Sequence, residues 1–166
     1  MRELEVVGVR VQMPDNQPIV LLRERHGDRY LPIWIGAPEA SAIAFAQQGV
    51  VPPRPLTHDL FKDVLDTFGH RLEQVRITEV RDNVYYAELV FAGGTTVSSR
   101  SSDAIAMALR VGCPIVGADQ VLEAGGVSVP DEDEDEVEKF REFLDQVSAE
   151  DFEQAPREGE GPEERG

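Results

Sequence analysis

The chain has 166 residues, of which 41% are hydrophobic, and its formal net charge is −16. This length suits one compact domain with a substantial core plus an appendage, and no apolar run approaches the roughly 20 residues of a membrane-spanning helix. The single cysteine, Cys113, excludes an internal disulfide and a multi-cysteine zinc motif. Because the start Met-Arg-Glu-Leu-Glu also lacks the apolar stretch of a signal peptide, we expect a cytoplasmic protein with no membrane association.

The first third of the chain predicts an antiparallel meander of three strands. Val7, Val9 and Val11 alternate with other residues, a second strand begins at Ile19, and a third ends at Ile35. Turn signals at residues 14–17 and 26–28 separate these strands. We expect the only tryptophan, Trp34, to pack in the core, with stacking on a nucleic-acid base as the alternative.

Helices and further strands follow the meander. Small residues over 40–48 predict a first helix, and residues 57–68 predict a second that ends at Gly69. A third, over 104–109, is apolar almost all round and therefore expected to be buried. We expect Thr57 to cap the second helix, and Ser101 or Ser102 the third. The remaining expected elements are strands from residue 75, over 84–91 and over 95–99, a short edge strand at 115–116, and a brief helix over 119–124.

The composition changes after Pro130. Residues 130–166 carry 16 acidic and 4 basic side chains, a net charge of −12 that leaves only −4 for residues 1–129. We expect an α+β domain over residues 1–130, with a mainly antiparallel or mixed sheet packed with three to four helices. Residues 131–154 predict an acidic amphipathic helix whose apolar face is Val137, Phe140, Leu144 and Val147. Residues 155–166, rich in Pro, Gly and Glu, predict a disordered tail.

Three segments resemble the bifunctional nuclease family in their order and spacing, over roughly residues 3–130. They are Leu-Pro-Ile-Trp-Ile-Gly-Ala-Pro-Glu-Ala at 31–40, Arg-Pro-Leu-Thr-His-Asp-Leu at 54–60, and Ser-Arg-Ser-Ser-Asp-Ala-Ile-Ala at 99–106. The chain is similar to an actinobacterial-type member that lacks the C-terminal UVR-like motif and has the acidic segment in its place. The resemblance implies an α+β fold and hydrolysis of DNA or RNA. Ser101 stands where family members commonly have proline.

Each of the three segments contributes a carboxylate to the first turn of an expected helix. These are Glu39, Asp59 and Asp103, and clustered carboxylates often hold the Mg²⁺ or Mn²⁺ that assists phosphodiester hydrolysis. If the helix starts converge, His58 is a further ligand or the general base, and Arg100 binds a phosphate oxygen. The alternative is that each carboxylate only stabilises its own helix start, since an acidic residue there complements the helix dipole.

Four arginines are candidate contacts to nucleic acid. Arg23 and Arg25 project from the same strand face near the turn at residue 26, but interspersed acidic residues also favour an ordinary solvated hairpin. The candidate set is Arg23, Arg25, Arg29 and Arg54.

Two functions follow from these patterns. The first is a nuclease acting on DNA or RNA, with divalent-metal assistance and a homodimer or higher homo-oligomer that covers the strand edges of the meander. The second is a non-catalytic adaptor, in which the domain is a scaffold and the acidic tail binds a basic protein. In an intermediate form, the tail folds over the arginines of its own domain and so excludes nucleic acid.

Overall fold

An eight-stranded mixed sheet, in the order β6-β5-β4-β7-β1-β2-β3-β8, organises residues 1–128, the part of the chain that the computed structural model describes. The N-terminal half is the predicted antiparallel meander of β1 (Arg2–Gln12), β2 (Gln17–Glu24) and β3 (Arg29–Trp34). The other half is a second meander of β4 (Leu72–Arg81), β5 (Val84–Phe91) and β6 (Thr96–Arg100). The predicted helix over 131–154 and the predicted tail over 155–166 lie outside the described residues.

The two meanders are joined by β7 (Ile115–Gly117). This strand pairs in parallel with β4, placing Ile115 opposite Val75, and antiparallel with β1, placing Ile115 opposite Leu4. The prediction of an edge strand at 115–116 is therefore wrong, because both neighbours of this short segment come from distant parts of the chain. The sheet ends instead at β6 on one side and at β8 (Val127–Ser128) on the other.

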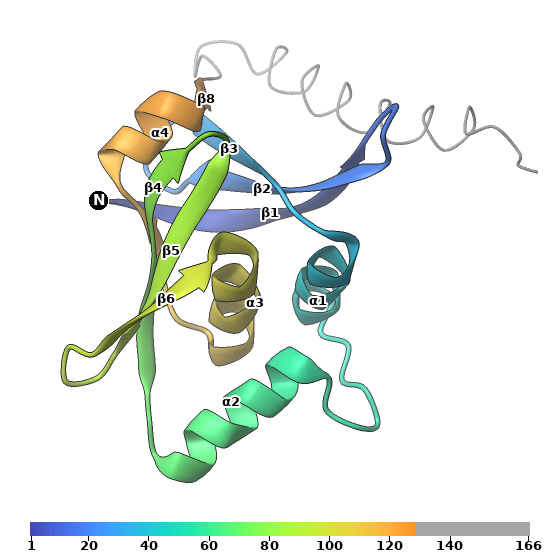
Figure 1. Ribbon diagram of the computed structural model, residues 1–166, viewed down its shortest axis with the longest axis vertical. Helices are drawn as coiled ribbons and strands as arrows, with labels where there is room; N and C mark the ends of the chain where they lie inside the picture. The colour runs from blue at the N-terminus through green and yellow to red at the C-terminus, as the bar shows by residue number, and fades with distance from the viewer. Residues whose placement is uncertain (129–166) are drawn as a thin grey trace, which may run out of the picture.

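Two helices cover the concave side of the curved sheet (Figure 1). They are α1 (Ala37–Gln47) and α3 (Ser101–Val111), while α4 (Asp119–Gly125) closes one end of the core. As its sequence predicts, α3 is the most deeply buried helix, with five consecutive residues from Ala104 to Ala108 at most 2% exposed. Burial of this helix positions its first turn, which carries Asp103, at the mouth of the core.

The remaining helix, α2 (Thr57–Phe68), lies below the sheet in Figure 1 and packs against α3. It has the predicted apolar spacing, yet none of its residues is buried. Leu65 packs against the core, whereas Leu60 and Phe68 are 52% and 72% exposed. Its C-terminal cap is Gly69, whose φ of 73° is the left-handed conformation that glycine adopts without steric cost.

Three local predictions are corrected. Trp34 is 49% exposed rather than packed in the core, and its indole Nε1 donates a hydrogen bond of 2.7 Å to the Gln12 side chain. The N-cap of α2 is Leu56, not Thr57, and that of α3 is Arg100, with Ser101 and Ser102 inside the helix. In both helices the residue before the expected cap already has extended backbone dihedrals, so each helix begins one residue earlier than its side chains suggest.

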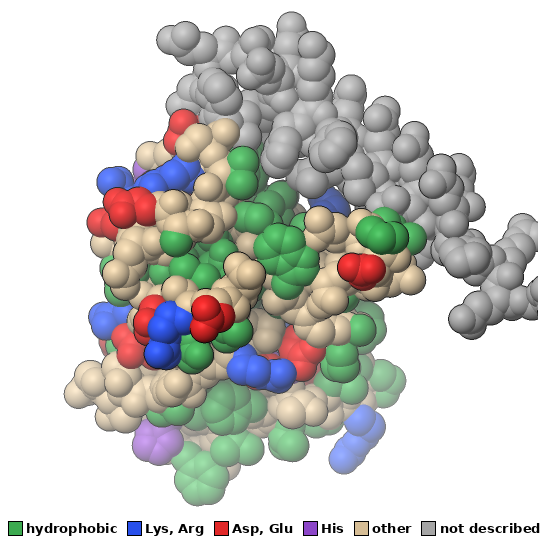
Figure 2. Space-filling view, turned by 45° about the horizontal axis from the view of Figure 1, so that its top comes forward, with side chains coloured by type: hydrophobic (Ala, Val, Ile, Leu, Met, Phe, Trp, Pro, Cys, Tyr) green, Lys and Arg blue, Asp and Glu red, His purple; other side chains and the backbone are tan. Residues whose placement is uncertain are grey.

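Acidic and basic side chains alternate on the face shown in Figure 2, without a continuous basic stripe. This agrees with the charge of residues 1–129, which is only −4 despite many ionisable groups. None of the helices within residues 1–128 combines the length and the apolar character that crossing a lipid bilayer requires.

Candidate functional site

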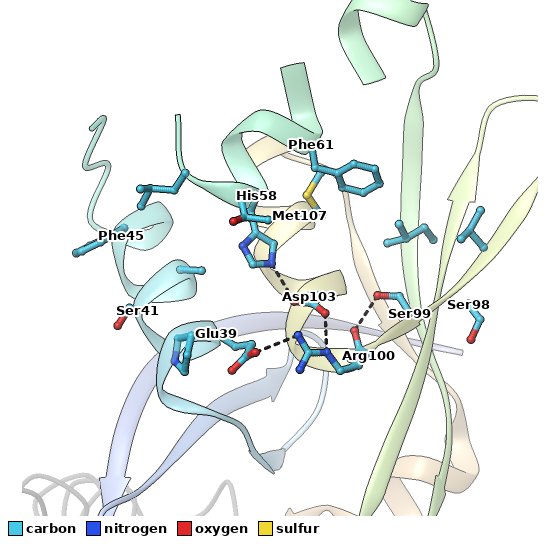
Figure 3. A pocket seen from close by; sticks show the side chains of 16 residues that line it. Glu39, Ser41, Phe45, His58, Phe61, Ser98, Ser99, Arg100, Asp103 and Met107 are labelled. Atoms are coloured by element: carbon cyan, nitrogen blue, oxygen red, sulfur yellow. Dashed lines mark hydrogen bonds and ion pairs between the residues drawn. The ribbon is translucent and has the colours of Figure 1, made fainter. Parts of the chain in front are cut away.

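Three separate parts of the chain meet at an open cavity of about 650 Å³. Most of its wall comes from α1, the start of α2, the end of β6 and the first two turns of α3, and Leu89 of β5 adds to it. Apolar side chains form one part of the wall, among them Phe45, Phe61, Val97 and Met107. Glu39, His58, Arg100 and Asp103 form the polar part (Figure 3). These four come from the three segments whose spacing predicted a site.

Asp103 is at the centre of the polar part. Its Oδ1 lies 2.9 Å from Nε2 of His58, and its Oδ2 accepts a hydrogen bond of 2.7 Å from Nε of Arg100. Nη2 of Arg100 lies 3.0 Å from Oε1 of Glu39, which completes a chain of four side chains, His58–Asp103–Arg100–Glu39 (Figure 3). We call this chain the polar relay.

The local sequence explains how the polar relay forms. Glu39 is in the first turn of α1, and its carboxylate folds back over Gly36, where the Cβ of any other residue would collide with it. Arg100 ends β6 and is the N-cap of α3, so Asp103 follows three residues later in the first turn. His58 enters from α2 and is only 17% exposed. Convergence of helix starts therefore brings together side chains that are distant in sequence.

The charges of the polar relay stabilise each other. Burial alone would raise the pKa of Asp103, but hydrogen bonds from Arg100 and His58 outweigh that cost and hold the pKa below its ordinary value. The same contact with Asp103, supported by Glu39, raises the pKa of Arg100 further above its already high value. Asp103 is therefore an ionised partner for the imidazole of His58 at neutral pH.

Asp59 does not join the polar relay, although it adjoins His58 in sequence. Its Oδ1 accepts a hydrogen bond of 2.8 Å from Nε of Arg110, and its Oδ2 accepts one of 3.1 Å from the backbone N–H of Leu56. The hydrogen bond from Arg110 is the main reason why the pKa of Asp59 is lowered. Asp59 thus stabilises the start of its own helix, which was the alternative to a metal-binding role. It also binds α2 to α3.

Arg110 is the partner of Asp59 that the sequence analysis missed. Its side chain is only 7% exposed and also donates a hydrogen bond of 3.0 Å to the carbonyl oxygen of Ala106. Asp103 and Arg110 are seven residues apart, two turns along one face of α3, where they meet the adjacent residues His58 and Asp59 of α2. The seven-residue spacing of Asp103 and Arg110, together with the adjacent His58 and Asp59, was the sequence pattern that could have predicted this contact.

The three carboxylates predicted to hold a metal are not assembled as a group. Within residues 1–128, no three His, Cys, Asp or Glu side chains are placed to hold a metal ion together. The reason is that the guanidinium of Arg100 already binds Glu39 and Asp103, and Arg110 binds Asp59. This arrangement does not fit Mg²⁺ or Mn²⁺, so we derive no chemical step through either ion.

None of the four arginines predicted to contact nucleic acid lines the cavity. Three of them form ion pairs on the first meander: Arg23 with Glu5, Arg25 with Glu3, and Arg29 with Glu24. Glu24 is 5% exposed, and the hydrogen bond from Arg29 is the main reason why its pKa is lowered. Arg54 is exposed in the segment before α2. The solvated-hairpin interpretation fits these pairs, since each positive charge has an acidic neighbour.

The cysteine has no part in the site. Cys113 follows Gly112, the left-handed residue that ends α3, and is partly buried as a free thiol. Burial raises the pKa of Cys113, which disfavours the reactive thiolate. Partial burial and the raised pKa favour a structural role over a nucleophilic one.

The fold and the cavity define an α+β protein with a histidine–carboxylate pair beside a carboxylate-bound arginine. Comparison with known proteins gives the family: residues 20–130 match the bifunctional nuclease domain, and the chain belongs to that family. An uncharacterized protein of Mycobacterium tuberculosis strain H37Rv is 55% identical over 161 residues, covering 92% of this chain and 98% of that protein.

Two plant relatives are more distant. Bifunctional nuclease 1 of Oryza sativa subsp. japonica is 29% identical over 114 residues, covering 63% of this chain and 34% of the plant protein. Bifunctional nuclease 1 of Arabidopsis thaliana is 28% identical over 135 residues, covering 71% of this chain and 42% of the plant protein. The similarity to these named nucleases is therefore confined to less than half of their length.

Proposed function

We propose that this protein cleaves phosphodiester bonds of DNA or RNA at the cavity that the polar relay lines. The observation that carries the proposal is the shared carboxylate of Asp103, which binds a histidine through one oxygen and an arginine through the other. This geometry holds a proton acceptor and a phosphate-binding cation side by side. Membership of the bifunctional nuclease family and the named plant relatives support the same activity.

His58 is the general base in this proposal. With Nε2 donating to the ionised Asp103, the lone pair of the imidazole is on Nδ1, which can accept a proton. The proton comes from the attacking group, a water molecule or a ribose 2′-hydroxyl, as its oxygen bonds to phosphorus. The bond from phosphorus to the leaving oxygen breaks, and a solvent proton neutralises that oxygen. Asp103 orients the imidazole and stabilises its protonated form.

Arg100 is the phosphate-binding group. A guanidinium has five N–H donors, and the contacts of Arg100 with the carboxylates of Asp103 and Glu39 involve Nε and Nη2. The side chain is 66% exposed and lines the open cavity, so its remaining donors are accessible to a ligand. A phosphate can bind there while Asp103 and Glu39 keep the guanidinium in place. The apolar wall with Phe45 and Phe61 offers a surface for the base or sugar of the same nucleotide.

The test is cleavage of labelled RNA and DNA oligonucleotides by the full chain and by the variants His58→Gln, Arg100→Gln and Asp103→Asn. Loss of a general base reduces rates by about 10²–10⁴-fold, and we expect His58→Gln to fall in that range. His70→Gln is the matched control, because His70 lies after α2 and does not line the cavity. Folded His58→Gln that cleaves as fast as the control would refute the proposal.

The same assay tests the predicted Mg²⁺ or Mn²⁺ dependence. Activity that EDTA abolishes and either ion restores would mean that the carboxylates rearrange around a cation during turnover. Activity unaffected by EDTA would agree with the arrangement described here, in which arginines bind the carboxylates.

A second candidate is the adaptor function, and the exposed apolar face of α2 favours it. Leu60, Val64 and Phe68 lie on this face and are at least 40% exposed. Exposed apolar surface of this kind often marks a protein-binding site. Cleavage activity that separates from the protein during purification, together with loss of partner binding in Leu60→Asp, would support this function over the nuclease.

A further inference from the structure

The outer face of the first meander carries apolar residues that do not belong to the core. Strand register places Ile19 opposite Trp34, Leu21 opposite Pro32, and Arg23 opposite Tyr30, so these residues share one face. Ile19, Leu21 and Tyr30 are at most 9% exposed, yet none of them is in the core cluster. We call Ile19, Leu21, Tyr30, Pro32 and Trp34 the outer stripe.

The core lies on the opposite face of the same strands. Val20, Leu22, Leu31 and Ile33 belong to the core cluster, and they alternate with the outer stripe along β2 and β3. The buried side chains of α1, α3 and α4 belong to that cluster too. No helix within residues 1–128 therefore accounts for the burial of Ile19 and Leu21.

We propose that the outer stripe is the docking site for this chain's own segment 137–147. In sequence, Val137, Phe140, Leu144 and Val147 recur at helical spacing and give that segment an apolar face. An amphipathic segment beside a stripe of apolar strand residues buries both surfaces from water.

The position where the described chain ends supports this occupant. Ser128 pairs with Arg29, at the start of β3, and Val127 pairs with Tyr30 of the outer stripe. Residues 129–136 can span up to about 26 Å, whereas Trp34 lies about 17 Å along β3 from Arg29. The linker is therefore long enough for segment 137–147 to reach every residue of the stripe.

The lengths of the two surfaces also match. A helical segment from 137 to 147 is about 15 Å long, and β3 from Tyr30 to Trp34 spans about 13 Å. One apolar face of the segment can thus cover the whole stripe.

Charge distinguishes this face from the exposed face of α2. Arg10 lies opposite Ile19, and Arg23, which is paired with Glu5, occupies the next outward position of β2 after Leu21, so these flanking groups sum to one positive charge. By contrast, α2 carries Asp59, Asp63 and Asp66 against a single Lys62. Residues 130–166, which include the proposed docking segment and have a net charge of −12, are therefore repelled less by the outer stripe than by α2.

The experiment compares the full chain with Leu144→Asp and Gln146→Asp. Both variants add one negative charge to the same segment, but only Leu144 belongs to its apolar face, so Gln146→Asp is the matched control. Trypsin cleavage after Lys139 and Arg141 measures how often the segment leaves the domain. We expect cleavage about tenfold faster in Leu144→Asp than in wild type, and unchanged cleavage in the control.

Trp34 gives a second, independent measurement because it is the only tryptophan in the chain. Acrylamide should quench its fluorescence more strongly in Leu144→Asp than in wild type or in Gln146→Asp. Equal cleavage and equal quenching in the two variants would overturn the proposal. If the protection of the segment from trypsin disappears on dilution and the protein is a dimer, a second copy of the chain covers the stripe. Protection that requires an added oligonucleotide would assign it to nucleic acid, and either result overturns the proposal.

Discussion

Helices α2 and α3 have similar lengths and both carry a full set of apolar residues, yet they differ in what holds them. In α3, the side chains from Ala104 to Ala108 are buried in the core. In α2 no residue is buried, and the helix is bound to α3 through two polar contacts, His58 with Asp103 and Asp59 with Arg110. The candidate active site lies where α3, which is held by its buried apolar side chains, meets α2, which is held by these polar contacts.

This difference indicates a division of roles. A rigid α3 fixes Asp103, while an α2 with little burial can shift His58 at low energetic cost, because local stability follows buried apolar contact. Stability measurements on variants of the two helices test this difference.

The largest effect is expected in α3. Ile105 is 0% exposed, so Ile105→Ala leaves a cavity and should lower the free energy of unfolding by about 2–5 kcal/mol. Urea denaturation followed by circular dichroism measures this loss. A loss under about 1 kcal/mol would mean that α3 is not the rigid element assumed here.

Removing the cation that binds α2 to α3 should have the next largest effect. Arg110→Met leaves the carboxylate of Asp59 without its cationic partner, which should cost about 1–3 kcal/mol. Arg110→Lys is the control that keeps the charge but not the guanidinium geometry, and it should recover part of the loss. If both variants unfold at the wild-type urea concentration, the Asp59–Arg110 pair does not hold α2 in place.

Acid should loosen the contacts between the two helices. The pKa values of Asp59 and Asp103 lie below the ordinary value, so their stabilising contribution is complete above the unfolded-state pKa, near 3.9, and is lost as the pH falls through the folded-state values. Thermal melting between about pH 6 and pH 2.5 should show the decline. The decline should be smaller in Asp103→Asn than in Asp15→Asn, a turn variant outside the site; equal slopes would exclude Asp103 as a contributor.

The smallest effect is expected on the exposed face of α2. Leu60 is 52% exposed, and Leu60→Ala should change the free energy of unfolding by less than about 0.5 kcal/mol. The same urea experiment used for Ile105→Ala provides the measurement. A loss comparable to that of Ile105→Ala would show that a partner covers this face in solution.

Much of the fold follows from local pattern. The meander, the burial of α3 and the glycine that ends α2 were predicted correctly, because alternation, apolar content and a left-handed cap depend on neighbouring residues. The central position of β7 and the exposure of Trp34 were not, since each depends on which distant segment packs beside it.

The candidate site shows the same limit. The helix starts do converge, and they bring Glu39, His58, Arg100 and Asp103 to one cavity. Sequence could not separate Asp59 from this group, because the adjacent residues His58 and Asp59 diverge only once α3 supplies a partner for each. The pairing of Arg100 and Arg110 with these carboxylates is likewise decided by tertiary contacts.

The late position of β7 in the chain has a consequence for biosynthesis. Residues 1–34 and 72–100 form two ribbons that make their common sheet only through Ile115–Gly117. A ribosome must therefore translate almost the whole domain before its two halves can unite, and until then each ribbon has an unpaired edge. Nascent chains that stall before residue 115 should be clients for chaperones that bind exposed strands.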